Sequence, residues 1–204
     1  EEEVQAVRLI ADRNRYFQND CFKKRVSRLE YSLLDIDRDD LFAEIIVLIK
    51  KHILQKQKIL VEFITKKSAL DFYEWIREAL DCETLCITGD DNSIERKRIL
   101  QQVEDSPGGT PLVLVATQVI EAGVDLKNIN LGFKDISMID LEEQFLGRIN
   151  RSNTGIGMVY FFNYDKAGNV YMKDNRKDFT LLQPEMRQVL ESKDFSPFYE
   201  KVLG

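Results

Sequence analysis

Short apolar runs alternate with amphipathic segments along most of the chain, and this alternation limits the possible folds more than any other feature. Apolar runs of about four to eight residues are typical of buried strands, whereas apolar residues that recur every three or four positions are typical of helices. We expect strands at 25–34, 58–65, 85–88, 112–116, 129–134 and 157–162. We expect helices at 40–55, 68–80, 92–103, 140–150 and 184–191. Strands joined by helices predict an α/β fold with an open, mostly parallel sheet and helices on both faces.

The residue pattern also predicts where some of these elements lie and begin. Residues 28–33 alternate polar and apolar side chains, so the first strand should form an edge of the sheet. The run 112–116 is the most apolar and should be central. The expected helix caps are Asp39, Ser68 with Asp71, and Asn92 with Glu95. A polar turn is expected around 167–169.

Length and composition are those of a folded domain. The chain has 204 residues, of which 44% are hydrophobic and 31% charged, so we expect one domain over 1–204. Within it we distinguish an N-terminal extension (1–57), a core that carries the motifs (58–162) and a C-terminal turn and helix (163–204). The acidic start without methionine suggests a piece of a longer polypeptide and no signal peptide.

Charge, cysteine content and hydropathy narrow the functional classes. A net charge of −6 argues against a protein that coats nucleic acid through bulk electrostatics. No apolar run approaches the roughly 20 residues of a membrane span, so we expect no membrane contact. Three cysteines and one histidine do not form a zinc site at the usual spacing, and an odd cysteine count fits a reduced, cytoplasmic setting. We therefore expect no metal site on this chain.

Three expected strands end in threonine, at Thr65, Thr88 and Thr117. In an open parallel sheet, ligands bind at the carboxyl ends of the strands, where the following helices present free backbone N–H groups to anions. Lys66 adds positive charge beside the first of these threonines. The alternative is that threonine is simply a good residue for a strand end. Taken together, the three threonines on one rim of the sheet favour binding of an anion such as a phosphate.

The segment after Thr117 contains a short turn with Gly123 and Asp125. Glycine permits a close or unusual backbone path, and the carboxylate of Asp125 could hold a ribose hydroxyl or a basic side chain. The alternative is a structural turn, because Gly-x-Asp turns are common. This segment is a candidate part of a nucleotide site.

The segment 144–151 places two arginines at helical spacing. Gln144, Arg148 and Arg151 would share one stripe of the expected helix, and Gly147 would remove bulk between them. Two guanidiniums on one face suit recognition of phosphate oxygens. The alternative is a solvated polar face on which Gly147 acts as a local helix stop.

Together, these segments resemble a known family. The patterns T-x5-G-x-D at 117–125 and Q-x-x-G-R-x-x-R at 144–151 resemble motifs V and VI of superfamily 2 helicases, and the strand–Thr65–helix unit lies where motif IV would. The residues at 117–125 and 147–151 are most similar to those of the CRISPR-associated helicase-nuclease of type I interference systems. The resemblance covers about 58–162. It departs from the family at Phe145, where that family often has arginine.

The resemblance implies the second, C-terminal RecA-like domain of a motor that binds ATP with Mg²⁺ between two such domains. Arg148 and Arg151 would act as arginine fingers on the γ-phosphate. Gln144, Gly123 and Asp125 would hold the nucleotide. Thr65, Lys66, Thr88 and Thr117 would contact single-stranded DNA. The implied partners are the first RecA-like domain, which supplies the Mg²⁺ ligands, a nuclease domain of the same polypeptide, single-stranded DNA and a CRISPR RNA-guided surveillance complex.

Several motifs of a complete enzyme of this kind do not occur in the sequence. There is no G-x-x-x-x-G-K-[ST] pattern and no D-E-x-[DH] box, so we expect no ATP hydrolysis by this chain alone. The nuclease would lie elsewhere, because the single histidine, His52, is expected at a surface or helix boundary. Trp75 is expected to pack at the edge of its helix rather than stack on a base. An RNA helicase, a DNA-repair translocase and a non-catalytic docking module are the alternatives.

Overall fold

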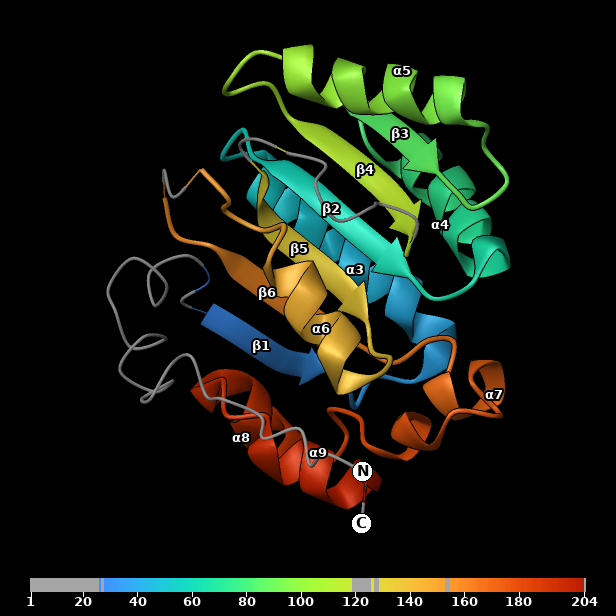
Figure 1. Ribbon diagram of the computed structural model, residues 1–204. Coiled ribbons are helices and arrows are strands. Elements are labelled where there is room, and N and C mark those ends of the chain that lie inside the picture. Colours follow the sequence, from blue (N-terminus) through green and yellow to red (C-terminus); the bar gives the residue numbers. More distant parts are fainter. Residues whose placement is uncertain (1–25, 27, 119–125, 127–128, 153–154, 204) are drawn as a thin grey trace, which may run out of the picture.

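The computed structural model describes residues 26, 28–118, 126, 129–152 and 155–203 (Figure 1). In this part of the chain, six strands form one sheet in the order β1-β6-β5-β2-β4-β3. The strands are β1 (Arg28–Leu33), β2 (Lys58–Phe63), β3 (Glu83–Ile87), β4 (Leu112–Thr117), β5 (Ile129–Asp135) and β6 (Met158–Phe162). All five neighbouring pairs are parallel, which confirms the predicted fold class.

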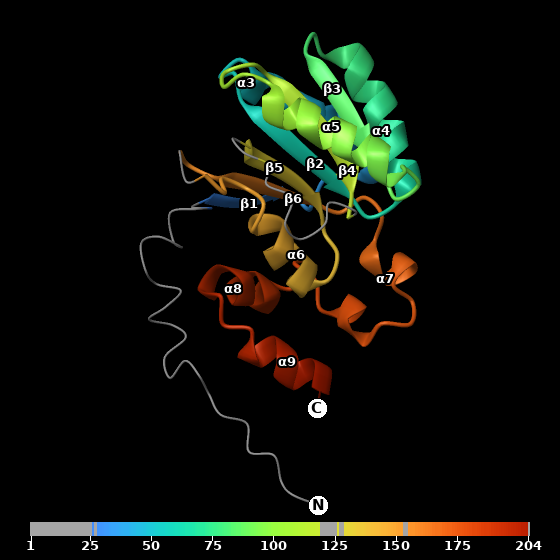
Figure 2. The ribbon, with the colours of Figure 1, turned by 45° about the horizontal axis from the view of Figure 1, so that its top comes forward.

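Helices cover both faces of the sheet (Figure 2). Helices α3 (Arg38–Ile53) and α4 (Lys66–Ala79) pack on one face. Helices α5 (Ser93–Asp105), α6 (Ile139–Leu146) and α8 (Pro184–Ser192) pack on the other, with α9 (Ser196–Leu203) against α8. The short α7 (Ala167–Val170) and the 3-10 helix η1 (Asn175–Asp178) follow β6. Among the described helices, none is both long and apolar enough to cross a membrane.

Alternation of side chains along the strands decides which face each residue serves. In β2, Ile59 and Val61 belong to the cluster under α3 and α4, whereas Leu60 belongs to the cluster under α6 and α8. Glu62 has the same parity as Leu60, so its side chain lies on the α6 face. The same reasoning puts Lys134 of β5 on that face, because it alternates with Phe133 of the opposite cluster.

The predicted edge strand is confirmed, since β1 lies at one edge of the sheet. The most apolar strand, β4, lies inside the sheet between β2 and β3, while β2 and β5 occupy the middle. Asn92 caps α5 as expected, accepting from the N–H groups of Ile94 and Glu95. Two other caps were predicted wrongly. Asp37 precedes α3 instead of Asp39, and α4 begins at Lys66 because the Thr65 hydroxyl accepts from the N–H of Ser68.

Three differences concern the second half of the chain. The helix expected at 140–150 ends at Leu146, the expected turn at 167–169 is the short helix α7, and α9 was not predicted. Asn150 explains the early end of α6. Its φ is 49°, its N–H donates to the carbonyl of Ile129 at 2.7 Å, and its side chain donates to the carbonyl of Gly155 at 2.8 Å. The chain therefore turns back toward the start of β5 in order to enter β6.

Candidate functional site

The side chains of Phe145 and Ile149 pack directly over Gly132 of β5. A Cβ atom at this position would lie 2.7 Å from Phe145 Cε1 and 2.9 Å from Ile149 Cδ1. Phe145 and Ile149 are fully buried against the sheet. The missing side chain therefore allows α6 and the turns after it to reach the polar residues at the carboxyl ends of β2 and β5.

Arg148, one of the two predicted fingers, lies in the turns that follow α6. Gly147 is the C-cap of α6, and the N–H groups of Arg148 and Ile149 each bond to the carbonyl three residues back. Arg148 Nη1 donates to Glu62 Oε2 at 3.2 Å, and its side chain is 14% exposed. The predicted helical stripe of Gln144, Arg148 and Arg151 is therefore wrong, because the helix stops before either arginine.

Glu62 belongs to a buried ion network that joins β2, β5 and α6. It lies opposite Lys134 in the register of β2 and β5, and Lys134 Nζ is 3.5 Å from Glu62 Oε1. Lys134 Nζ is also 3.8 Å from Glu142 Oε2 on α6. The three side chains are at most 2% exposed. We call Glu62, Lys134, Glu142 and Arg148 the ion network; with all four groups ionised their formal charges cancel.

Burial and mutual attraction act against each other on these groups. Burial raises the pKa of Glu62, and the positive charges of Lys134 and Arg148 lower it in part. Burial raises the pKa of Glu142 to about 7, again opposed by Lys134. For Lys134, burial lowers the pKa, but the surrounding carboxylates outweigh it, so its pKa is raised and the ammonium form is retained. Lys134 is thus the positive centre on which the two carboxylates depend.

Further hydrogen bonds hold the network in place. Lys134 Nζ donates to the carbonyl of Asp135 at 2.6 Å and to Ser137 Oγ at 3.3 Å. The Ser137 N–H and hydroxyl both donate to Glu142 Oε1. Gln118, which follows β4, donates to Ser137 Oγ at 3.3 Å and accepts from the hydroxyl of Tyr171 at 2.7 Å. Residues from four separate parts of the chain therefore meet at one end of the sheet.

Arg151 and Gln144 are exposed. Arg151 follows Asn150, which is fully buried and anchored by its backbone and side chain. The exposed residue Arg151 therefore comes directly after a residue with left-handed backbone, Asn150. Both predicted arginines lie in the segment after α6, one held inward by Glu62 and the other on the surface.

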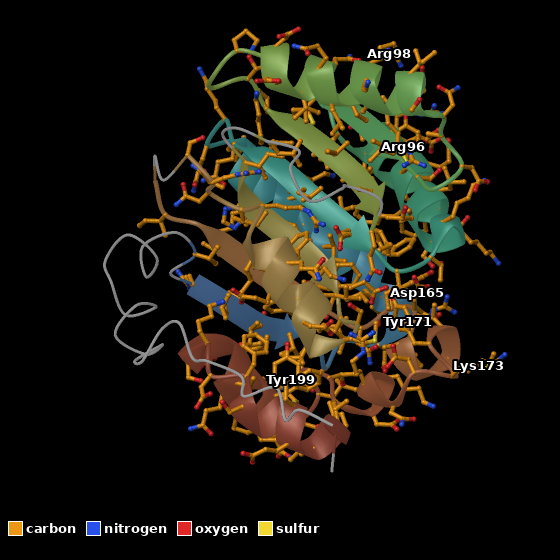
Figure 3. All side chains as sticks on the ribbon, in the orientation of Figure 1. Arg96, Arg98, Asp165, Tyr171, Lys173 and Tyr199 are labelled. Carbon is orange, nitrogen blue, oxygen red and sulfur yellow. The ribbon has the colours of Figure 1, made fainter. Side chains whose placement is uncertain are left out.

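On the α4 side, Thr65 meets a carboxylate from a distant part of the chain. Asp165 lies after β6, and Figure 3 shows it at the carboxyl end of the sheet together with Tyr171. Its carboxylate accepts from the Thr65 N–H at 2.8 Å, from the Thr65 hydroxyl at 3.2 Å and from the Ser68 hydroxyl. The N-terminus of α4, predicted to receive a phosphate, thus already holds an anionic group.

The other strand-end residues have different surroundings. The N–H and hydroxyl of Thr88, which is buried, both donate to Asp91. Lys66 forms an exposed ion pair with Asp90. Thr117 is 5% exposed, and no described residue forms a hydrogen bond with its hydroxyl.

Four further predictions concern single residues. Gly123 and Asp125 lie outside the described residues. His52 is at the end of α3, as expected, but it is buried rather than at the surface, and its Nε2 lies 3.3 Å from the hydroxyl of Tyr160. Trp75 is 55% exposed and its ring packs edge to face on Phe42, which fits the expected boundary packing.

Sequence reasoning missed Glu62, Lys134, Glu142 and Asp165 as parts of the site. Glu62 and Lys134 could have been noticed in the sequence, because a charged residue inside an otherwise apolar, buried strand rarely lies there without a partner. Glu142 carried a weaker signal, because it precedes the arginine motif by one helical turn or less. Asp165 carried no local signal, since it is 100 residues from Thr65.

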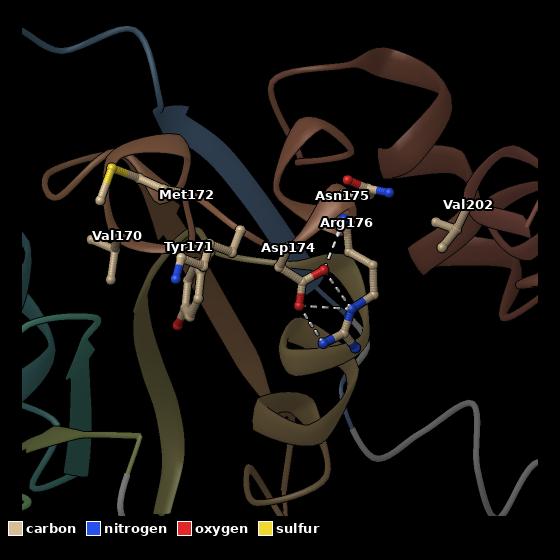
Figure 4. A pocket seen from close by; sticks show the side chains of 8 residues that line it. Val170, Tyr171, Met172, Asp174, Asn175, Arg176 and Val202 are labelled. Atoms are coloured by element: carbon tan, nitrogen blue, oxygen red, sulfur yellow. Dashed lines mark hydrogen bonds and ion pairs between the residues drawn. The ribbon is translucent and has the colours of Figure 1, made fainter.

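An open pocket of about 630 Å³ is lined in part by Tyr171, whose hydroxyl donates to Gln118 (Figure 4). It is lined by α7, the segment through η1 and Val202 of α9. Its arginine, Arg176, already pairs with Asp174 in the pocket and with Asp140 of α6. Among the described residues, no group of three or more His, Cys, Asp or Glu is placed to hold a metal ion.

Comparison with known proteins agrees with the resemblance. The family model "CRISPR-associated nuclease/helicase Cas3, C-terminal" matches residues 55–154. UvrABC system protein B of Symbiobacterium thermophilum is 32% identical over 114 residues, which are 56% of this chain and 16% of that protein. The CRISPR-associated nuclease/helicase Cas3 of Haloferax volcanii is 45% identical over 58 residues, 28% of this chain and 6% of that protein. The chain thus spans about a sixth or less of these two relatives.

Among solved structures, T. fusca Cas3 with ADP aligns with a TM-score of 0.64 over 84% of this chain and 24% of that chain, at 15% identity. At this identity the likeness concerns the fold. It extends the similarity beyond the residues that the family model matches. The sequence matches support a C-terminal superfamily 2 helicase domain near that of Cas3, and the solved structures show its RecA-like fold.

Proposed function

We propose that the chain is the second motor domain of an ATP-dependent single-stranded-DNA translocase of CRISPR interference, in which Arg148 and Arg151 act as arginine fingers. The observation that carries this proposal is the pair of arginines that follows α6 within the matched segment, one exposed and one fixed by Glu62. Guanidinium groups suit the γ-phosphate because they are planar, permanently charged and rich in donors. Such a finger contributes about 10³–10⁵ in rate in phosphoryl-transfer enzymes.

ATP with Mg²⁺ would lie between this domain and a first RecA-like domain. The donors offered here, the two guanidiniums and the amide of Gln144, fit the anionic end of a nucleotide. The sequence has no phosphate-binding loop, so the loop and the Mg²⁺ ligands belong to the first domain in this proposal. Bound Mg²⁺ would neutralise charge on the phosphates. The chain's own part is to bring arginine to the γ-phosphate when the two domains close.

Contacts to the DNA backbone would come from the carboxyl ends of the strands. Thr117 is the best placed, because no described residue bonds to its hydroxyl. Thr65 and Thr88 can contribute a hydroxyl only if Asp165 and Asp91 release it. Lys66 can contribute charge once it leaves Asp90. The same polypeptide would carry the nuclease domain, and a CRISPR RNA-guided surveillance complex would deliver the DNA.

The test is ATP turnover by the chain alone and with a first RecA-like domain. We expect no turnover alone and DNA-stimulated turnover after addition of that domain. In the intact ATPase, Arg151→Ala should lower DNA-stimulated turnover by about 10³-fold and change ATP binding little. Arg77→Ala on the surface of α4 is the matched control and should have no effect. Near-normal turnover in Arg151→Ala would refute the assignment.

A DNA-repair translocase is the second candidate. The observation that favours it is the relation to UvrABC system protein B, which covers 114 residues against 58 for the Cas3 of Haloferax volcanii. Stimulation of the intact motor by single-stranded DNA, damaged duplex DNA and RNA separates the candidates. Preference for damaged duplex would favour the repair function, and preference for RNA would favour an RNA helicase. A docking module predicts that both arginines can be replaced without loss of function.

A further inference from the structure

We propose that Glu62 is a positioning residue for Arg148, fixing the guanidinium through the sheet so that it meets the nucleotide in one orientation. The proposal rests on the function proposed above, because it assumes that Arg148 acts on the nucleotide. It adds a residue that lies outside the segments 117–125 and 144–151, as a charged residue in the otherwise nearly apolar run 58–65.

The first step is the contact itself. Glu62 Oε2 accepts from Arg148 Nη1 at 3.2 Å, and the two residues are 86 positions apart in the sequence. Glu62 is 2% exposed and Arg148 is 14% exposed, so water screens their attraction little. The link joins a central strand to the turns after α6, which Asn150 also anchors.

The second step is the support of the carboxylate. A lone buried carboxylate would tend to take up a proton and lose its charge. Lys134, opposite on β5, lies 3.5 Å from the other Glu62 oxygen and is held by Asp135, Ser137 and Glu142. Glu62 therefore uses one oxygen for the fixed lysine and the other for the arginine. Its position is set by the sheet and not by a flexible loop.

The third step is the benefit for Arg148. An arginine side chain has several free rotations, and holding it in one geometry costs conformational entropy at the moment of binding. A guanidinium carries five N–H donors, so the bond through Nη1 is compatible with donation to phosphate oxygens. A preset guanidinium stabilises developing charge without reorganisation during the reaction. Glu62 thus acts on the rate of hydrolysis more than on the affinity for ATP.

The experiment compares Glu62→Gln with wild type in the intact ATPase. We expect kcat to fall by about 10- to 100-fold, as for other residues that orient a functional side chain, with KM for ATP changed by less than about 3-fold. Glu142→Gln also neutralises a carboxylate next to Lys134 but does not touch Arg148, so it should reduce kcat less. Glu74→Gln on the exposed face of α4 should leave turnover unchanged.

A double-mutant cycle separates positioning from damage to the fold. If Glu62 acts through Arg148, Glu62→Gln should have little further effect on kcat in an Arg148→Ala background. Equal losses in both backgrounds, an unchanged kcat, or a higher kcat in Glu62→Gln would overturn the inference. If Arg148→Ala itself leaves kcat unchanged, the proposed role of Arg148 fails instead. The two failures are therefore distinguishable.

Discussion

The carboxyl end of the sheet has two polar regions that are built in opposite ways. On the α6 side, the ion network of Glu62, Lys134, Glu142 and Arg148 is buried, and its charges depend on one another. On the α4 side, Thr65 and the buried Ser68 form partly buried bonds with Asp165, and Lys66 forms an exposed pair with Asp90. The first region holds a candidate catalytic side chain in position. The second keeps candidate DNA contacts occupied by carboxylates.

The difference shows that a suitable residue at a strand end does not by itself make a free ligand site. Two of the three threonine hydroxyls that could donate to a phosphate already donate to an aspartate, Thr65 to Asp165 and Thr88 to Asp91. Arg148 is also bonded, but its guanidinium has several donors, whereas a hydroxyl has one. One bond to a carboxylate therefore uses the whole donor capacity of a threonine hydroxyl but only part of that of a guanidinium.

The largest expected effect is on the stability of the buried region. Replacing Lys134 by Met should lower the free energy of unfolding by about 3–5 kcal/mol, because two buried carboxylates lose their shared positive partner. Urea unfolding of the chain measures this. Lys201→Met, which removes an exposed pair with Glu185, is the matched control and should change stability little. A loss below about 1 kcal/mol in Lys134→Met would mean that the network is not interdependent.

The pH dependence of stability should come next in size. Burial raises the pKa of Glu142 to about 7, so the folded chain binds this proton more tightly than the unfolded chain. The free energy of unfolding must then fall as pH rises from the ordinary glutamate pKa through about 7. Above about pH 7, the whole penalty for ionising the buried Glu142 carboxyl is present. Glu142→Gln should remove this part of the pH dependence, worth at most about 3 kcal/mol between about pH 5 and pH 8.

The measurement compares unfolding of wild type and Glu142→Gln at both pH values. Glu62 and Asp135 also have raised pKa values and are present in both proteins, so the difference reports Glu142 together with the change that its removal causes in the titration of Glu62. Lys134 faces Glu142 in both proteins and remains charged. Parallel pH profiles for the two proteins would show that Glu142 does not titrate in this range.

Most of the fold follows from local patterns. The apolar runs that predicted β2 and β4 are wholly buried, and the alternating run predicted the edge strand β1. The end of α6 did not follow, because it depends on a bond from Asn150 to Ile129 across the sheet. Periodicity reports which face a residue would take if a helix continued. It does not report where a distant strand forces the helix to stop.

The site was predictable only in its residue types. Arg148 and Arg151 were identified from their spacing, and both lie in one segment, but on turns and with unequal exposure. Glu62 and Lys134 become partners through strand register, which a single sequence does not encode locally. The position of Asp165 at Thr65 depends on the path of the chain after β6. Pairings between distant residues are therefore what the structure adds.

A moderate effect is expected at the N-terminus of α4. Asp165→Ala should lower the free energy of unfolding by about 1–3 kcal/mol, since the Thr65 N–H and the Thr65 and Ser68 hydroxyls lose an acceptor. Asp178→Ala in η1 is a control for removal of an exposed carboxylate. Binding of single-stranded DNA by the intact motor should be equal to or tighter than that of wild type, because an anion leaves the site. Weaker binding in a folded variant would show that Asp165 assists the DNA contact instead.

The smallest expected effect is at Lys66, whose side chain is 46% exposed and whose partner Asp90 is 72% exposed. Asp90→Ala should change the free energy of unfolding by at most about 0.5 kcal/mol, because water and salt screen an exposed pair and its formation costs side-chain entropy. The same change frees a positive charge beside Thr65, so DNA affinity of the intact motor should rise at low salt and approach the wild-type value at high salt. Equal affinity at low salt would remove Lys66 from the DNA contacts. A stability loss above about 1 kcal/mol would instead contradict the contrast between the two regions, because an exposed pair would then support the fold as a buried one does.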